Sequence, residues 1–106
     1  MELVTSQELE QMKLNKQKLL IDFFAEWCGP CKMIMPKLES FESDFPDIKF
    51  VKVDIDKNRD YVMKLGIRSV PTIMVFNGDE IVDTSIGAKP DIHYKDILTK
   101  VQEYGK

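Results

Sequence analysis

The stretch FFAEWCGPCK, residues 23 to 32, holds the only two cysteines of this chain, Cys28 and Cys31. The apolar run LLIDFFA, residues 19 to 25, leads into it without a turn residue, which is typical of a strand buried on both faces of a sheet. Apolar residues then recur at helical spacing from Cys31 to Phe45. The two thiols therefore lie where a central strand passes into a helix, and open α/β sheets usually hold reactive groups there.

The same patterns divide the rest of the chain. Strands are expected over residues 19–25, 48–55, 72–76 and 80–86. A first helix is expected to begin at the capping-box pair Thr5 and Glu8 and to end at the polar run NKQK. A long helix from Cys31 to Phe45 is expected to kink at Pro36. A short helix over residues 61–65 and a last helix that begins at Pro90-Asp91 complete the set. The turn Asn77-Gly78-Asp79 joins the last two strands as a hairpin. This order predicts an α/β fold in which a parallel pair of strands precedes an antiparallel pair.

Length and composition indicate one soluble globular domain over residues 1–106. The chain is 43% hydrophobic and 31% charged, which is ordinary for a protein with a packed core. Its formal net charge is −3 and its basic residues are scattered, so the basic face that nucleic acid requires is not expected.

The first ten residues, MELVTSQELE, carry acidic residues where a signal peptide needs a basic start and an apolar run. No apolar run approaches the length of a membrane span. The sequence therefore predicts a cytoplasmic protein without membrane contact, although the mature form of an exported protein would look the same. In a reducing cytosol a close cysteine pair is more often catalytic or metal-binding than structural.

The position of the two cysteines predicts different roles for them. Cys28 precedes the helix, and Pro30 suits the first helical position because its missing N–H would have had no partner there. Unpaired N–H groups and the positive end of the helix dipole then favour a thiolate at Cys28, the species that attacks disulfides. Cys31 lies on the apolar stripe of the helix, so we expect it to be shielded and to act as the resolving thiol.

Two other chemistries are open to a cysteine pair. A structural zinc site needs four ligands, whereas this chain has no second cysteine pair and one histidine, His93. A cysteine hydrolase needs a histidine beside its nucleophile. We expect His93 on the solvated side of the last helix, so the pattern favours neither alternative.

The motif WCGPCK, with LLIDFFAE before it and GIRSVPTIMVFNG downstream, resembles the thioredoxin family along nearly the whole chain. The resemblance implies a thioredoxin fold, with a central mixed sheet of about five strands flanked by four helices. It also implies a thiol-disulfide oxidoreductase that acts on protein substrates and is recharged by a thioredoxin reductase. No cofactor or metal is implied; NADPH would act only through the reductase, and the protein would be a monomer.

Asp22 stands inside the apolar strand. Burial without a partner would favour the neutral form of its carboxyl, so its carboxylate would readily accept a proton from Cys31. The alternative is an aspartate turned to solvent through a bulge, because strand alternation alone does not fix its side. The resemblance favours the buried proton acceptor and pairs it with Lys52, whose ammonium would temper the shift in pKa.

The resemblance also implies a substrate-binding surface. Pro71 in SVPT resembles the family's cis-proline packed against the cysteine pair, and the backbone of Val70 would bind an extended substrate segment. Trp27 either fills the core or, beside Cys28, covers the thiols and contacts the substrate. The remaining residues of this surface are Gly29, Pro30, Gly66, Ile67, Gly87 and Ala88. Phe24 departs from the tryptophan common at its position in the family.

The leading hypothesis is a reductant of protein disulfides, because Gly-Pro between the cysteines resembles the reducing members of the family. One alternative is a disulfide oxidase or isomerase of the same fold. The other is a docking module in which the apolar surface binds a partner and the cysteines are incidental.

Overall fold

The computed structural model describes residues 1–104, and its centre is a five-stranded mixed sheet in the order β1-β3-β2-β4-β5. The strands are β1 (Glu2–Leu3), β2 (Lys18–Phe24), β3 (Ile48–Asp54), β4 (Thr72–Asn77) and β5 (Glu80–Ile86). β2 pairs with β3 in parallel and with β4 in antiparallel orientation, and β4 pairs with β5 as a hairpin. The expected parallel pair followed by an antiparallel pair is confirmed.

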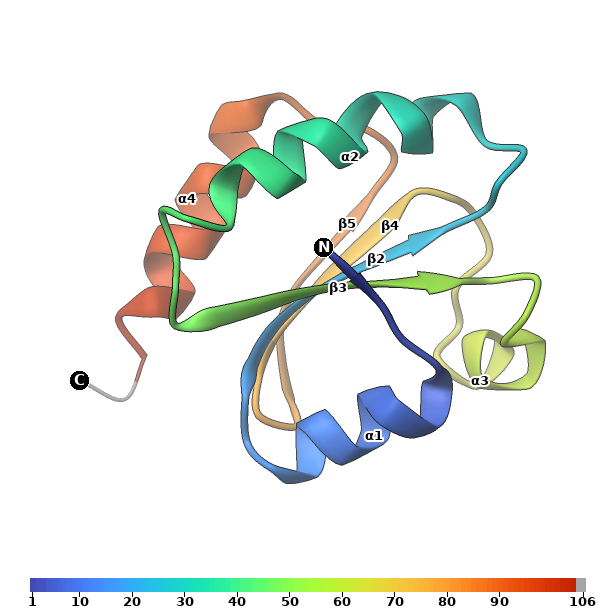
Figure 1. The fold of residues 1–106 in the computed structure, drawn as a ribbon, viewed down its shortest axis with the longest axis horizontal. Coiled ribbons are helices and arrows are strands. Elements are labelled where there is room, and N and C mark those ends of the chain that lie inside the picture. Colours follow the sequence, from blue (N-terminus) through green and yellow to red (C-terminus); the bar gives the residue numbers. More distant parts are fainter. Residues whose placement is uncertain (105–106) are drawn as a thin grey trace.

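Within residues 1–104, four helices cover the two faces of the sheet. They are α1 (Ser6–Leu14), α2 (Gly29–Phe41), α3 (Arg59–Lys64) and α4 (Asp91–Gln102). Figure 1 shows α2 and α4 above the sheet and α1 and α3 below it. The expected thioredoxin fold, a mixed sheet with four helices, is therefore confirmed.

Alternation along β2 decides which side chains meet which helices. Leu20 points to the α2/α4 face and joins a buried core with residues of both helices, among them Ile34, Leu38, Tyr94 and Leu98. Leu19, Ile21 and Phe23 point to the opposite face, where they pack with Leu9 of α1 and Val62 of α3. By the same alternation Asp22 and Phe24 lie on the α2/α4 face, as Leu20 does.

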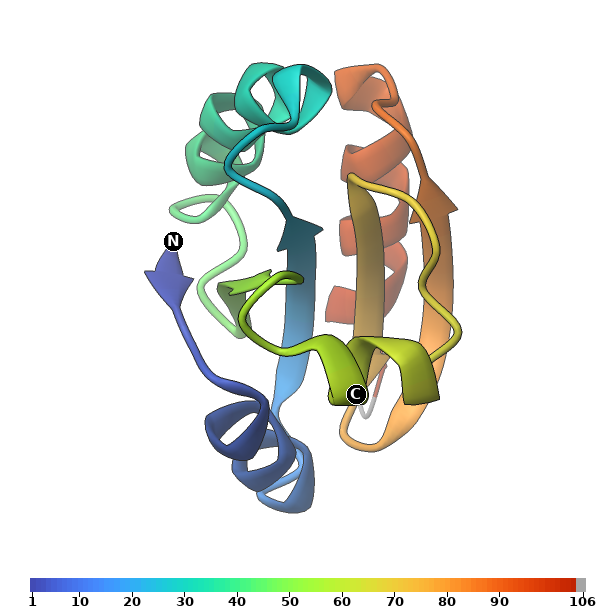
Figure 2. The ribbon, with the colours of Figure 1, turned by 90° about the vertical axis from the view of Figure 1, so that its right-hand side faces the viewer.

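The structure differs from the sequence expectations at two elements. The sequence did not predict β1, because a strand of two exposed residues shows no periodic pattern. Only its pairing with Val51 and Lys52 defines it as a strand. Figure 2 shows β1 and β5 at opposite edges of the sheet. The long helix ends at Phe41 rather than Phe45, and a turn over residues 42–44 follows it; Phe45 itself precedes Pro46, and a residue before a proline avoids the helical conformation. Phe45 is nevertheless buried and packs edge-on against Phe41, which explains why the apolar pattern continues past the helix.

The capping box of α1 yields a stability prediction. The Thr5 hydroxyl accepts a hydrogen bond from the Glu8 N–H at 3.2 Å, and the Glu8 carboxylate accepts one from the Thr5 N–H at 3.0 Å. Thr5→Ala should lower the free energy of unfolding by about 1 kcal/mol, because one end-of-helix N–H loses its partner. Urea denaturation measures this loss. Thr99→Ala, at an exposed threonine within α4, is the control; an equal loss in both variants would show that the cap is not the cause.

Candidate active site

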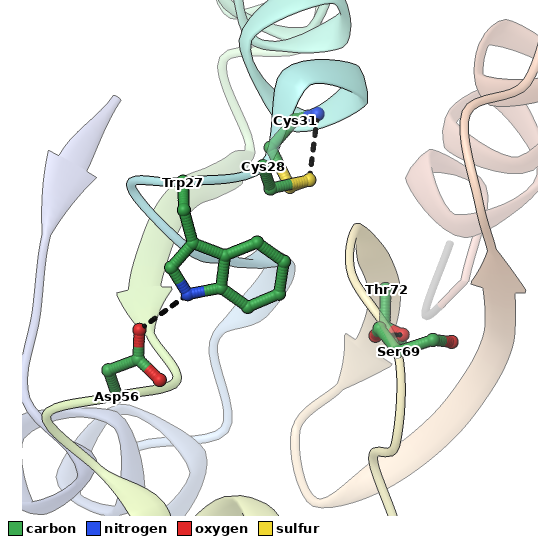
Figure 3. Close-up of a disulfide and its surroundings, with 6 residues drawn as sticks. All are labelled: Trp27, Cys28, Cys31, Asp56, Ser69 and Thr72. Atoms are coloured by element: carbon green, nitrogen blue, oxygen red, sulfur yellow. Dashed lines mark hydrogen bonds between the residues drawn. A yellow bond between two sulfur atoms is a disulfide. The ribbon is translucent and has the colours of Figure 1, made fainter.

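Cys28 is the N-cap residue of α2 and is joined to Cys31 by a disulfide, with their Cα atoms 5.3 Å apart. The backbone N–H of Cys31 also donates a hydrogen bond to the Cys28 sulfur, at 3.2 Å. Both residues are largely buried, with exposed fractions of 4% for Cys28 and 1% for Cys31. Figure 3 shows the pair at the start of the helix, where the chain leaves β2.

The start of α2 is electrostatically favourable for a thiolate. The first turn contains no acidic side chain, so nothing there opposes the positive end of the helix dipole. Pro30 occupies this turn as expected, although the helix begins one residue earlier, at Gly29. A sulfur anion at Cys28 would therefore meet the helix N-terminus and the N–H of Cys31.

Asp22 is fully buried, and the bulge that would turn it to solvent is absent from β2. The strand pairs residue by residue with β3 from Lys18 to Phe24, so Asp22 stays on the α2/α4 face. Within residues 1–104 neither of its carboxylate oxygens has a hydrogen-bond partner. Burial raises the pKa of Asp22 from 3.8 to about 7, and the charge of Lys52 partly opposes this rise. The carboxyl thus gains and loses its proton near neutral pH.

Lys52 lies directly opposite Asp22 on β3 and is half-buried. It lines a pocket of about 440 Å³ together with Cys31 and Phe24. The structure therefore places Lys52 and the inner cysteine around one hollow on the α2/α4 side of the sheet.

Trp27 is 70% exposed, so the alternative in which it fills the core is wrong. Its indole N–H donates a hydrogen bond to a carboxylate oxygen of Asp56 at 2.9 Å, which draws the ring toward the end of β3 (Figure 3). Asp56 is itself held by its N–H, which donates to the carboxylate of Asp54 at 2.8 Å. Sequence reasoning missed Asp56, and the only signal was the Asp-x-Asp spacing just after a strand.

The Val70–Pro71 peptide bond is cis, as the resemblance implied. Val70 packs against the buried cluster of Ala25, Cys28 and Cys31. Figure 3 shows Ser69 and Thr72 next to each other on the segment around Pro71, where the Thr72 hydroxyl donates a hydrogen bond to the Ser69 carbonyl at 2.7 Å. The Pro71 carbonyl accepts a hydrogen bond from the Gly87 N–H at 2.8 Å, so the segment that follows β5 lies beside this loop.

The other residues of the expected substrate surface differ in their exposure to solvent. Gly29, Pro30, Gly66 and Ala88 are exposed. Gly66 and Gly87 have positive φ angles of 76° and 84°, a conformation that suits glycine. Ile67 is half-buried and packs against the core on the α1/α3 face, so only part of its side chain is available to a substrate.

The expected solvent orientation of His93 is wrong. The ring is half-buried, and its Nε2 lies 2.6 Å from the hydroxyl of Ser85 on β5. The same hydroxyl is 2.9 Å from a carboxylate oxygen of Asp83. A carboxylate only accepts, so Ser85 donates its single proton to Asp83 and His93 donates to Ser85. His93 thus ties the first turn of α4 to β5.

Residues 1–104 contain no group of three or more His, Cys, Asp or Glu side chains arranged to hold a metal ion. In the same range, no helix has the length and apolar character required to cross a membrane.

A cysteine pair that closes into a disulfide at the start of a helix is the reactive part of a thiol-disulfide oxidoreductase, and the fold and site define this class. The family model for thioredoxin matches residues 1–100. The chain belongs to the thioredoxin family, and its cysteine pair supports dithiol-disulfide exchange.

Individual relatives agree with this assignment. A thioredoxin of Bacillus subtilis is 43% identical over 83 residues, which cover 77% of this chain and 80% of the relative. A thioredoxin of Streptomyces clavuligerus is 44% identical over 88 residues, covering 82% of each chain. Among solved structures, a thioredoxin of Fasciola hepatica superposes with a TM-score of 0.86 at 31% identity, covering 94% of this chain and 98% of the other.

Proposed function

We propose that this protein reduces disulfides of other proteins, with Cys28 as the attacking thiolate and Cys31 as the resolving thiol. The observation that carries the proposal is the position of Cys28 at the N-cap of α2, where its sulfur accepts the N–H of Cys31. Cys31 lies one turn further into the helix and is the less exposed of the two. A helix N-terminus stabilises a thiolate at the outer sulfur rather than at the inner one.

The reaction takes two exchange steps. The Cys28 thiolate attacks one sulfur of the substrate disulfide, forms a mixed disulfide and releases the other substrate sulfur as a thiolate. Cys31 then gives its proton to Asp22, and its thiolate attacks the Cys28 sulfur. This step releases the second substrate thiolate and leaves the Cys28–Cys31 disulfide, so two electrons pass to the substrate. Thioredoxin reductase returns two electrons to the pair, and NADPH supplies them to the reductase.

Asp22 suits the role of proton acceptor because its pKa of about 7 lets it take up a proton at neutral pH. Lys52 supports this role as the neighbouring cation that limits the rise of the Asp22 pKa. Both residues lie on the sheet face that α2 covers, beneath the helix that carries Cys31.

The substrate segment is expected to dock on the loop opposite the disulfide. Within residues 1–104 the backbone N–H and C=O of Val70 have no backbone partner, so they are free to pair with an extended chain. Trp27, Gly29, Pro30, Gly66, Ile67, Pro71, Gly87 and Ala88 are proposed to complete the contact surface.

The remaining expectations complete the proposal. We place all of residues 1–106 in one domain that acts as a monomer in the cytoplasm and needs no bound cofactor; residues 105 and 106 lie outside the described part of the chain. The match of one family model to residues 1–100 supports the single domain.

Trp27→Ala tests the contact surface. Loss of an exposed aromatic ring beside Cys28 should raise KM for a protein disulfide about tenfold, since such a contact contributes about 1 to 1.5 kcal/mol, with little change in kcat. Steady-state kinetics measure both constants. Leu14→Ala, at a 74% exposed position at the end of α1, is the matched control. An unchanged KM in Trp27→Ala would remove this residue from the surface.

An insulin reduction assay with thioredoxin reductase and NADPH tests the proposed function. The protein should accelerate NADPH oxidation and insulin precipitation, and the Cys28→Ser variant should not. Failure of the reductase to recharge the protein, with disulfide formation in a reduced substrate instead, would favour an oxidase or isomerase. A double Cys→Ser variant that keeps full biological activity would favour a docking module.

A further inference from the structure

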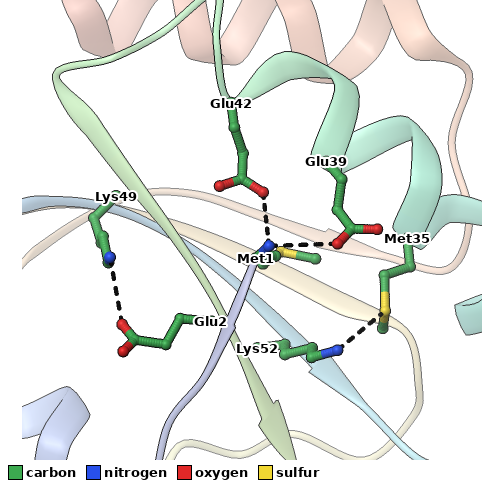
Figure 4. Close-up of polar contacts among 7 residues, drawn as sticks. All are labelled: Met1, Glu2, Met35, Glu39, Glu42, Lys49 and Lys52. Atoms are coloured by element: carbon green, nitrogen blue, oxygen red, sulfur yellow. Dashed lines mark hydrogen bonds and ion pairs between the residues drawn. The ribbon is translucent and has the colours of Figure 1, made fainter.

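The ammonium of Lys52 is held by uncharged partners. Its Nζ lies 3.7 Å from the sulfur of Met35 on α2 and 5.8 Å from the centre of the Phe24 ring on β2. Figure 4 shows Lys52 reaching from β3 toward Met35. Asp22, its neighbour across the parallel strands, has no hydrogen-bond partner within residues 1–104. The lysine therefore influences Asp22 through space, from a position that Met35 and Phe24 determine.

Neither contact neutralises the ammonium. A thioether sulfur is a weak acceptor, and an aromatic face attracts a cation by its quadrupole alone. The interaction of two charges varies inversely with their separation, and water weakens it strongly. Where the ammonium is held thus decides how much it stabilises a carboxylate on the adjacent strand.

Other charged and titratable groups around the pair come from each neighbouring element. Glu26 and Lys32 line the same pocket as Lys52, but both are exposed and screened by solvent. Tyr94 of α4 faces the Asp22 side of the sheet, with its pKa raised mainly by burial, so it stays neutral. β4 contributes the apolar Ile73 opposite Asp22, and α2 contributes Cys31. Among residues 1–104, Lys52 is thus the cation whose charge opposes the rise of the Asp22 pKa.

We infer that Met35 is a positioning residue for the exchange reaction: with Phe24, its thioether holds the Lys52 ammonium on the sheet face that carries Asp22 and so sets the pH at which Asp22 exchanges its proton. Without this contact the ammonium extends into the water of the pocket. The carboxylate then loses part of its favourable interaction. The effect on turnover rests on the proposed role of Asp22, whereas the effect on its proton affinity does not.

The test is an NMR titration of the Asp22 carboxyl carbon in the oxidised protein. Met35→Leu keeps the volume of the side chain but removes the acceptor. It should raise the Asp22 pKa by about half a unit, a shift in keeping with the strength of such contacts. Met35→Gln, which restores an acceptor at similar length, should return the pKa to the parent value or below. Met33→Leu, at a 69% exposed position on the same helix, should change nothing.

An unchanged Asp22 pKa in Met35→Leu would overturn the inference, because the sulfur would then not hold the ammonium. A lowered pKa would also overturn it, because Met35 would then be keeping the two charges apart. The pH profile of substrate release separates this inference from the proposed function. A pKa that rises without a matching shift of that profile would support Met35 as a positioning residue and contradict Asp22 as the proton acceptor.

Discussion

Replacing Cys31 with serine is expected to stop turnover and to leave the protein covalently joined to its substrate. Cys28 keeps its place at the N-cap of α2, so its thiolate still attacks a disulfide. The mixed disulfide then persists, because serine cannot displace the Cys28 sulfur. Non-reducing electrophoresis after incubation with a disulfide-containing protein should show a stoichiometric adduct that dithiothreitol releases.

Cys28→Ser is the matched control for this experiment. It leaves only the inner thiol, which is 1% exposed and lies within the first turn of α2 rather than at the N-cap, where the helix dipole best stabilises a thiolate. This variant should form almost no adduct. Equal trapping by the two variants, or trapping by Cys28→Ser alone, would contradict the assignment of attacking and resolving roles.

Replacing Asp22 with asparagine is expected to stabilise the fold and to slow substrate release. Each pKa unit corresponds to about 1.36 kcal/mol. Raising the Asp22 pKa from 3.8 to about 7 therefore corresponds to about 4 kcal/mol of destabilisation once the pH exceeds both values. A buried amide without partners has its own desolvation cost, so the net gain at pH 8 should be smaller, about 1 to 3 kcal/mol.

The pH dependence of this gain follows from the direction of the shift. The folded protein holds the Asp22 proton up to higher pH than the unfolded chain does. The parent protein therefore loses stability as the pH rises from about 4 to about 7, relative to the variant. Below pH 4 the carboxyl is neutral in both states and the gain disappears.

Urea denaturation of the oxidised proteins at several pH values between 4 and 8 measures this gain, with Asp47→Asn at an exposed position as control. A gain of equal size at all pH values would contradict a buried carboxyl that titrates near 7. The kinetic arm is separate: unchanged release of reduced substrate in Asp22→Asn would contradict its role as proton acceptor.

The central part of the fold could be predicted from the sequence because it has strong periodic signals. The buried strand before Cys28 and the capping box at Thr5 appear in the structure as the patterns indicate. The side of the sheet on which Asp22 lies could not be decided by alternation, because one bulge would reverse it. The unbroken register with β3 settles its position.

Several features of the site depend on contacts between distant segments, which local patterns do not reveal. Asp56 meets Trp27 across 29 positions, and Met35 meets Lys52 across 17. No apolar pattern predicts that His93 of α4 lies against β5, because the residue that it meets there, Ser85, is polar. The Val70–Pro71 isomer was expected from family resemblance alone, since the residues by themselves favour trans.

The reduction potential of the Cys28–Cys31 disulfide, measured by equilibration with defined redox buffers, tests most directly whether this protein is a reductant. We expect a value near −270 mV, the value known for thioredoxin itself, since the cysteine pair encloses the same Gly-Pro. Disulfide oxidants such as DsbA lie near −120 mV, a difference of about 7 kcal/mol for a two-electron couple. A potential near −270 mV would support reduction of protein disulfides as the function. A potential near −120 mV would contradict it and identify an oxidant on the same fold.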